Sequence, residues 1–144
     1  MIFVISLAVL ILDQASKYLI MANMTLNQSV PVITDVFHIT YIRNPGAAFG
    51  LMAYRTTFFI AVSILVILGI FIFYKKYGGK GAVPVTLGLI AGGALGNLVD
   101  RVRFGEVVDF LDFRVWPVFN LADSAIVVGA GLLMIVFWRL EGKA

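Results

Sequence analysis

The chain contains no cysteine and only one histidine, His38, among its 144 residues. The lack of thiols excludes a cysteine nucleophile, a disulfide framework and a cysteine-ligated metal site. A single histidine excludes the H-E-x-x-H zinc motif and argues against any multi-histidine site. The G-x-S-x-G elbow of serine hydrolases is also missing. Carboxylates are therefore the residues left to examine for chemistry.

Charge is scarce as well, because only 13% of the residues are charged while 61% are hydrophobic. The mean hydropathy of +1.01 reflects the same bias. A soluble domain is usually about half apolar, so too little polar material remains here to cover a water-facing surface. The sequence indicates an integral membrane protein, in which the net charge of +3 serves topology and contact with anionic lipids, not nucleic acid.

Four segments are long and apolar enough to be spans, since a membrane helix needs about 20 mostly apolar residues. They cover residues 2–22, 57–74, 82–102 and 118–138 of a single domain, 1–144. The first segment lacks a basic n-region, and Asp13 and Lys17 interrupt it. We therefore expect a retained helix there and not a cleaved signal peptide.

Basic residues between the spans predict the orientation. Lys75, Lys76 and Lys80 lie between the second and third spans with no acid among them. By the positive-inside rule this loop is cytoplasmic, which places both termini there too, in agreement with Arg139 and Lys143. Loops 23–56 and 103–117 then face outward, although five arginines on that side weaken the argument: Arg43, Arg55, Arg101, Arg103 and Arg114.

The first outer loop has the composition of a small β-sheet. Residues 30–42 are rich in β-branched and aromatic side chains, which favours one or two short strands. Asn44, Pro45 and Gly46 then indicate a turn. The second outer loop is expected at the membrane interface, with Trp116 as an anchor. The predicted fold is thus an all-α membrane protein of four transmembrane helices, with a small extracytoplasmic β-sheet between the first and second helices.

Ionisable groups inside spans are costly and usually face the protein interior with a partner. Asp13 and Lys17 share one helix face, so they pair with each other or Asp13 accepts hydrogen bonds from another span. Asn97, Asp100 and Arg101 also share a face, either as a solvated or paired cluster at the outer interface or as interior groups.

Small residues and glycines accompany these polar groups in the third span. Gly92 and Gly96 form a small-xxx-small pattern, which is typical of close helix packing.

Three further acids stand near the outer end of the fourth span. Asn120 and Asp123 are three residues apart, so one of them caps the helix, or Asp123 lies one turn inside the membrane. Asp109 is either a solvated loop acid or partly buried among its apolar neighbours, and Asp112 is expected at the surface.

Asp100, Asp109 and Asp123 lie at one predicted membrane level. Two close carboxylates can share one proton, because both do not ionise easily together. The ionised member can then activate a water against a peptide carbonyl while the protonated member polarises that carbonyl. This chemistry requires neither a metal nor a cofactor.

The motifs together resemble those of the bacterial lipoprotein signal peptidases, signal peptidase II. The resemblance covers nearly the whole chain and includes five segments in order: Asp13–Lys17, Arg43–Phe49, Gly92–Arg101, Val107–Phe110 and Phe119–Ser124. It implies an aspartyl endopeptidase of the bacterial cytoplasmic (inner) membrane, with the active site near the outer face. Such enzymes remove the signal peptide from diacylglyceryl-modified prolipoproteins, cutting on the N-terminal side of the lipidated cysteine.

The resemblance also implies roles for individual residues. It maps the catalytic pair onto Asp109 and Asp123. Asp100 ranks third, as a partner of Arg101 that orders the site. The substrate-binding or supporting residues are Asp13, Asn44, Asn97, Asp100, Arg101 and Asn120. No metal or cofactor is expected, and the partners are the prolipoprotein substrate and membrane lipids for a chain acting as a monomer.

Two departures and two alternatives stand beside this interpretation. Pro45 occupies a position where a small polar residue is expected, and 111–118 is short, which puts substrate contacts from that loop in doubt. A small transporter or ion-conducting subunit would also use intramembrane polar groups, but would spread them through the bilayer depth. An assembly scaffold would use them only to hold helices together. Under the peptidase interpretation, residues 37–42 would cradle the substrate.

Overall fold

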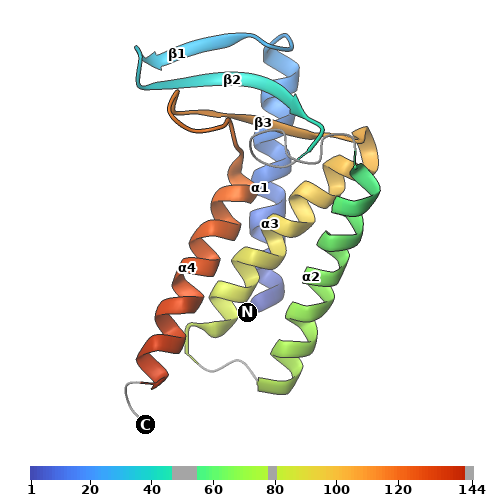
Figure 1. Ribbon diagram of the computed structural model, residues 1–144, viewed down its shortest axis with the longest axis vertical. Coiled ribbons are helices and arrows are strands. Elements are labelled where there is room, and N and C mark those ends of the chain that lie inside the picture. The colour runs from blue at the N-terminus through green and yellow to red at the C-terminus, as the bar shows by residue number, and fades with distance from the viewer. Residues whose placement is uncertain (47–54, 78–80, 142–144) are drawn as a thin grey trace.

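The computed structural model describes residues 1–46, 55–77 and 81–141, which form four helices and three strands. The helices are α1 (Ile2–Asn23), α2 (Thr56–Tyr77), α3 (Val83–Phe104) and α4 (Leu121–Glu141). All four are long and apolar enough to cross a membrane. They run side by side with the strands at one end, which we call the sheet side (Figure 1). The N-terminus of α1 and the C-terminus of α4 lie at the opposite end. The predicted fold class is confirmed.

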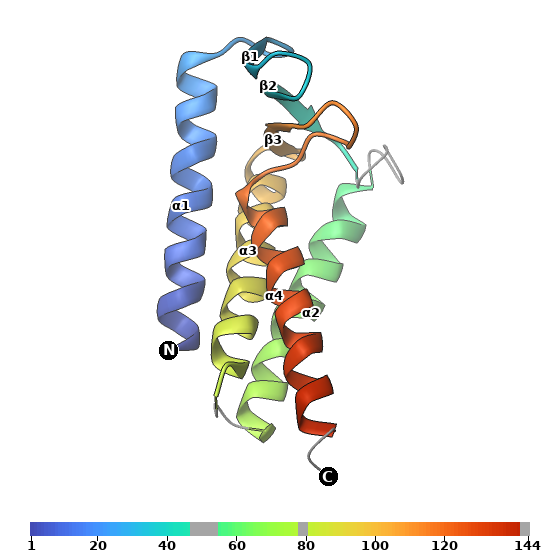
Figure 2. The same ribbon diagram turned by 90° about the vertical axis from the view of Figure 1, so that its left-hand side faces the viewer.

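The strands form one antiparallel sheet with the order β1-β2-β3. They are β1 (Ser29–Ile33), β2 (Phe37–Asn44) and β3 (Val107–Asp112). The third strand is a difference from the sequence analysis, which places no strand in 103–117. Its residues are almost all buried, so the polar/apolar alternation that identifies a half-exposed strand is absent. Figure 2 shows the sheet lying over the end of the bundle.

Helix α3 is the centre of the bundle, with 61% of its span buried inside the protein, against 22%, 6% and 11% for α1, α2 and α4. Its glycines make this possible. A Cβ on Gly92 would lie 2.7 Å from the Cβ of Val9 and 2.8 Å from the carbonyl oxygen of Ser6 on α1. A Cβ on Gly96 would meet the Asp13 carboxylate. The small-xxx-small pattern is therefore confirmed as a helix-packing surface.

A polar cluster fills the rest of the interface between α1 and α3. The Nζ of Lys17 lies 2.9 Å from Oδ2 of Asp13 and 2.9 Å from Oδ2 of Asp100. All three side chains are at most 1% exposed. Gln14 donates from Nε2 to Oδ1 of Asp100 (2.9 Å). Asp100 therefore pairs with Lys17, and the expected pairing with Arg101 is wrong, since no ion pair joins those two described residues.

The carboxylates of Asp13 and Asp100 also accept backbone N–H groups from the neighbouring elements. The backbone N–H of Ala122 in the first turn of α4 donates to Oδ1 of Asp13 (2.9 Å). The backbone N–H of Val108 in β3 donates to Oδ2 of Asp100 (3.0 Å). The first N–H groups of a helix have no partner within it, so Asp13 satisfies one of these at α4. The cluster thus joins α1, α3, α4 and β3.

Helix α4 begins at Leu121, three residues after the predicted start of the fourth span. The delay has a backbone cause, because Phe119 exchanges hydrogen bonds with Leu111 of β3, at 2.8 and 3.0 Å. Asn120 follows as the capping residue. The alternative in which the helix is already under way at residue 118 is therefore wrong.

Replacement of Gly92 by alanine is expected to destabilise the protein. The new Cβ would meet the α1 backbone at Ser6, which cannot move as a flexible side chain can, so overpacking should cost about 1–3 kcal/mol. Gly131→Ala in α4 is the control, because a Cβ there meets nothing within 4 Å and alanine favours the helix. Thermal unfolding in detergent measures both. Equal transition temperatures for the two variants would contradict the packing account.

Replacement of Lys17 by methionine should be more damaging, because it leaves Asp13 and Asp100 buried together without a cation. Breaking a buried ion pair in this way typically costs about 3–5 kcal/mol. Lys75→Met, at an exposed position of α2, is the matched control. The thermal transition should fall sharply for the first variant and hardly change for the second. A Lys17→Met protein as stable as wild type would show that the cluster does not hold the helices together.

Candidate active site

Asp109 and Asp123 come from different elements and are joined by one side chain. Asp109 lies on β3 and is 2% exposed, while Asp123 lies in the first turn of α4. Asn120 donates from Nδ2 to Oδ1 of Asp109 (2.7 Å), and its Oδ1 accepts the backbone N–H of Asp123 (2.9 Å). Oδ2 of Asp123 in turn accepts the N–H of Asn120 (3.3 Å). This reciprocal cap fixes where α4 begins and aims Asp123 toward Asp109.

Asn97 connects the pair to the buried cluster. Its Oδ1 accepts hydrogen bonds from Nζ of Lys17 and Nδ2 of Asn120, both at 3.1 Å. With two donors facing that oxygen, the amide has one sensible orientation, so Nδ2 points to Asp123. It donates to Oδ1 of Asp123 at 2.7 Å.

Asn44 donates a hydrogen bond to Asp109 in the way that Asn97 does to Asp123. Its Nδ2 donates to Oδ2 of Asp109 (2.9 Å), while its Oδ1 accepts the N–H of Gly46 (3.0 Å). Each of the four carboxylate oxygens of Asp109 and Asp123 thus receives one N–H. The arrangement holds both acids in place and leaves room at each for one further partner.

The environment changes the acidity of Asp109. The pKa of its carboxyl group is raised from 3.8 to about 7, chiefly by burial and secondly by the nearby Asp123 carboxylate. Hydrogen bonds from Asn44 and Asn120 and the charge of Lys17 lower the pKa and offset part of this rise. Asp109 is therefore able to carry a proton near neutral pH, as a general acid must.

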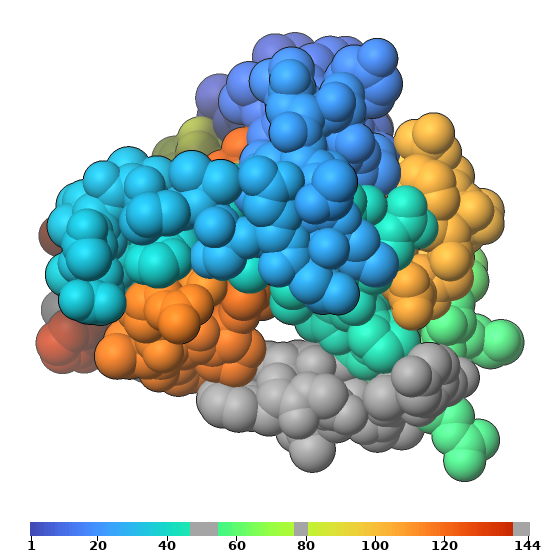
Figure 3. Space-filling model, turned by 90° about the horizontal axis from the view of Figure 1, so that it is seen from above, coloured from blue at the N-terminus to red at the C-terminus, as the bar shows by residue number. Residues whose placement is uncertain are grey.

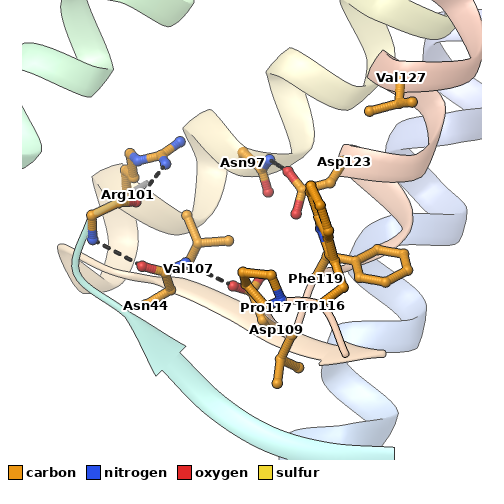
Figure 4. Close-up of a pocket in the computed structure, with 12 residues that line it drawn as sticks. Asn44, Asn97, Arg101, Val107, Asp109, Trp116, Pro117, Phe119, Asp123 and Val127 are labelled. Atoms are coloured by element: carbon orange, nitrogen blue, oxygen red, sulfur yellow. Dashed lines mark hydrogen bonds between the residues drawn. The ribbon is translucent and has the colours of Figure 1, made fainter. Parts of the chain in front are cut away.

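A cavity of about 310 Å³ opens beside both acids. It is lined by Asn44, Gly46, Asn97, Arg101, Val107, Asp109, Trp116, Pro117, Val118, Phe119, Asp123 and Val127. Figure 4 shows Asp109 and Asp123 facing this space, with aromatic and apolar side chains beside them. Seen from the sheet side, the molecule is hollowed between β2 and the orange segment that includes β3 (Figure 3). A few convergent polar groups in an otherwise apolar pocket are typical of a ligand site.

An apolar hollow of about 490 Å³ adjoins this cavity. The two share Trp116, Phe119, Asp123 and Val127, and the hollow continues along α4 to Val128. A substrate with an apolar part therefore finds an apolar surface directly beside the two acids.

Arg101 lines the cavity without a carboxylate partner. Its Cζ lies 4.9 Å from the centre of the Phe59 ring, a cation–π distance. Its Nη2 is 3.4 Å from the carbonyl oxygen of Gly46. The guanidinium thus remains available to a carbonyl or carboxylate of a bound substrate.

The structure brings together six of the eight residues selected from the sequence. Those lining the cavity or bonded to its acids are Asn44, Asn97, Arg101, Asp109, Asn120 and Asp123. Asp13 and Asp100 do not line the cavity. Both contact Lys17, which in turn donates a hydrogen bond to the cavity residue Asn97.

Sequence reasoning gave too little weight to Lys17 and Gln14. The signal for Lys17 was present in its spacing of four from Asp13 and in the cost of a cation inside a span. Asp112, expected at the surface, is only 5% exposed, and Thr40 and Arg114 bond its carboxylate at 2.8 and 3.0 Å. Residues 47–49 of the second motif, and Lys80 and Lys143 of the charge argument, lie outside the described residues.

No group of three or more His, Asp or Glu side chains is arranged to hold a metal ion in the described parts of the chain. The chemistry that the site itself offers is that of two carboxylates in an apolar surrounding, in which burial raises the pKa of Asp109.

Comparisons with known proteins agree on one family. The family model "Signal peptidase (SPase) II" matches residues 5–139. The lipoprotein signal peptidase of Halothermothrix orenii is 52% identical, over 98% of this chain and 97% of its own length. That of Pelotomaculum thermopropionicum is 52% identical, over 91% and 87%.

Solved structures of bacterial membrane enzymes share the fold. A bacterial membrane enzyme solved by the in meso method at 2.3 Å resolution superposes with a TM-score of 0.89 at 35% identity, and the match covers 99% of this chain and 90% of that one. A second such enzyme, solved at 1.9 Å, gives 0.82 at 36% identity, with 94% and 91% covered. Sequence, family model and fold therefore converge: the chain belongs to the signal peptidase II family of membrane proteases.

Proposed function

We propose that Asp109 and Asp123 are the catalytic pair with which this chain removes signal peptides from lipid-modified prolipoproteins. The observation that carries the proposal is the junction at Asn120, whose side-chain amide donates to Asp109 and accepts the N–H of Asp123. It holds two acids from different elements at one cavity. The activity itself follows from the family and from relatives that are lipoprotein signal peptidases.

The two acids have different surroundings, which supports a division of roles. Asp123 lies in the first turn of α4, where the helix dipole and the N–H of Asn120 favour a negative charge. Asp109 lies on a strand and receives only side-chain amides, and its pKa is raised to about 7. Asp109 is therefore the proton carrier of the resting enzyme, and Asp123 is its base.

The reaction follows from these protonation states. Asp123 takes a proton from a water molecule as its oxygen attacks the scissile carbonyl, and protonated Asp109 donates its hydrogen bond to the carbonyl oxygen. The tetrahedral intermediate then collapses as its C–N bond breaks and Asp109 donates its proton to the leaving amine, so that the pair keeps the one proton that Asp123 took from water. The apolar lining strengthens these electrostatic interactions because it excludes water.

The position of the cavity supports a substrate held at the membrane surface. The acyl chains of a lipidated cysteine would stay in the bilayer while its peptide bond reaches the two acids on the sheet side. The Phe37 ring lies 4.8 Å from that of Phe113, which stacks at 5.9 Å on Phe119 in the cavity wall. This aromatic row supports the substrate-cradle role expected for residues 37–42.

The orientation and the oligomeric state are part of the same proposal. Lys75 and Lys76 lie in the last turn of α2, at the end away from the sheet, which supports a cytoplasmic location for that end and for both termini. The sheet and the acids would then face outward from a bacterial cytoplasmic membrane. One chain supplies both acids, so a monomer suffices for catalysis.

Three substitutions test the assignment on a diacylglyceryl-modified prolipoprotein in detergent. Asp109→Asn and Asp123→Asn should each lower cleavage by about 10³-fold or more while leaving the fold intact, because each removes one of two groups that act as a unit. Asp100→Asn should keep partial activity and lose thermal stability, since Asp100 holds Lys17 and β3 and does not reach the cavity. Activity without any ion gradient also separates a peptidase from a transporter.

Two outcomes would contradict the assignment of Asp109 and Asp123 or the peptidase activity. Full activity of a folded Asp109→Asn protein, with activity abolished in Asp100→Asn, would move the catalytic pair to Asp100 and Asp123. An inactive wild type on authentic substrate would remove the peptidase proposal itself.

The pH dependence of kcat/KM tests the role of Asp109. Activity should fall as pH rises through about 7, because Asp109 must be protonated to act. The hydrogen bond from Asn44 stabilises the ionised form and lowers the pKa, so Asn44→Ala should move this descending limb upward, by roughly one pH unit. Asn23→Ala, at an exposed end of α1, is the control and should leave the limb in place. A limb that moves downward in Asn44→Ala would contradict the assignment.

A further inference from the structure

Two arginines share one aromatic ring at the sheet-side end of α3. The Cζ of Arg43 lies 4.7 Å, and that of Arg103 4.8 Å, from the centre of the Phe104 ring. We call Arg43 and Arg103, together with the Phe104 ring that both contact, the arginine pair. The ring attracts both cations and so holds their like charges within two cation–ring distances of each other, an arrangement that an anion would stabilise.

None of the carboxylates in the described parts of the chain supplies that anion. The ion pairs of the described residues involve only Lys17 and Arg114 as cations. Glu106, two residues after Phe104, makes no ion pair with either arginine. Residues 47–54, which lie outside the described ranges, contain no Asp or Glu in their sequence. The arginine pair thus has no ion-pair partner among the described residues.

The arginine pair is separate from the catalytic cavity. Neighbouring residues of a strand point to opposite faces of the sheet, and Asn44 points to Asp109. Arg43 therefore lies on the other face of β2, where Nε donates to the Tyr41 hydroxyl (3.2 Å) and Nη2 approaches the Met21 sulfur at 4.0 Å. Arg103 is not a lining residue of the cavity, whereas Arg101 is.

The place of the arginine pair along α3 indicates its depth in a membrane. Phe104 is the last residue of α3, so both guanidiniums would lie where this candidate span leaves the hydrocarbon. Val102, two residues earlier, is 66% exposed and would belong to the apolar surface that faces lipid. Phosphate groups of phospholipids lie at this depth, and the planar guanidinium suits phosphate oxygens.

A favourable interaction with the α3 helix dipole explains the position of Arg103 but not that of Arg43. A cation in the last turn of a helix is favourable, which accounts for Arg103. Arg43 comes from β2 and lies against the same ring without belonging to that helix. Arg55 adds a third cation nearby, because the next residue, Thr56, donates to the carbonyl of Gly105 (2.7 Å).

We propose that Arg43 and Arg103 bind the phosphate group of an anionic phospholipid in the sheet-side leaflet, at a site distinct from the catalytic cavity. The lipid's phosphate contacts both guanidiniums, and its acyl chains lie on the apolar surface below. The site anchors the ends of β2 and α3, the two elements that carry Asn44 and Asn97, against the membrane surface.

Lipid retention by the purified chain tests this without relying on proteolysis. The protein is exchanged into micelles containing either phosphatidylglycerol or zwitterionic phosphatidylcholine, and the lipids that remain bound are counted by native mass spectrometry. Wild type should keep phosphatidylglycerol in preference to phosphatidylcholine, and its thermal transition should rise with the anionic fraction. Arg43→Gln/Arg103→Gln should weaken retention by about tenfold, because each arginine near a membrane surface contributes to anionic-lipid binding. Arg139→Gln, at the opposite end of the bundle, is the matched control and should behave as wild type.

A single-substitution variant and a titration with inorganic phosphate complete the test. Arg103→Gln alone, at an exposed helix position, provides a folded variant if the double substitution does not fold, and it should lose several-fold in retention. Inorganic phosphate separates the sources of the anion. A shift with phosphate equal to that with phosphatidylglycerol would overturn the lipid assignment in favour of a free-phosphate site. Equal phosphatidylglycerol retention by wild type and the arginine variants would overturn the site altogether.

Discussion

The ammonium group of Lys17 is the contact on which the rest of the structure depends. It is buried in a span, and it is tolerated because two carboxylates and one amide oxygen surround it at 2.9–3.1 Å. Each of those carboxylates then accepts a backbone N–H, one from α4 and one from β3. Because a buried charge without partners is very costly, these contacts form together or not at all. A single cation thereby sets the relative positions of the elements that carry the two candidate catalytic acids.

The same cation also acts on the site through Asn97. A side-chain amide can present either its oxygen or its nitrogen to a neighbour, and only the nitrogen suits a carboxylate. Lys17 and Asn120 both donate to the oxygen of Asn97, which leaves its nitrogen for Asp123. The site is thus held by a chain of hydrogen bonds with a defined direction. Such preorganisation reduces the reorganisation needed during reaction.

The sequence predicted much of this fold and of the candidate site, and the exceptions have physical causes. Hydropathy predicted the four spans, and the spacing of glycines and polar residues predicted which faces of α3 meet other helices. The strand β3 could not be predicted, because a strand that is buried along its length lacks alternation. The pairing of Asp100 was assigned to its neighbour Arg101, whereas the actual partner is Lys17, 83 residues earlier in the chain and close only in the folded structure. Distant contacts of this kind are fixed by helix packing, which local patterns do not contain.

We expect this framework to keep one acid of the pair protonated near neutral pH. Infrared spectroscopy of the purified protein tests it directly, because a protonated carboxyl group and a carboxylate absorb at different frequencies. Wild type should show a protonated-carboxyl band that titrates near pH 7 and is lost in Asp109→Asn. The absence of any such band above about pH 5, where ordinary aspartates are already ionised, would contradict it. So would a band that remains unchanged in Asp109→Asn.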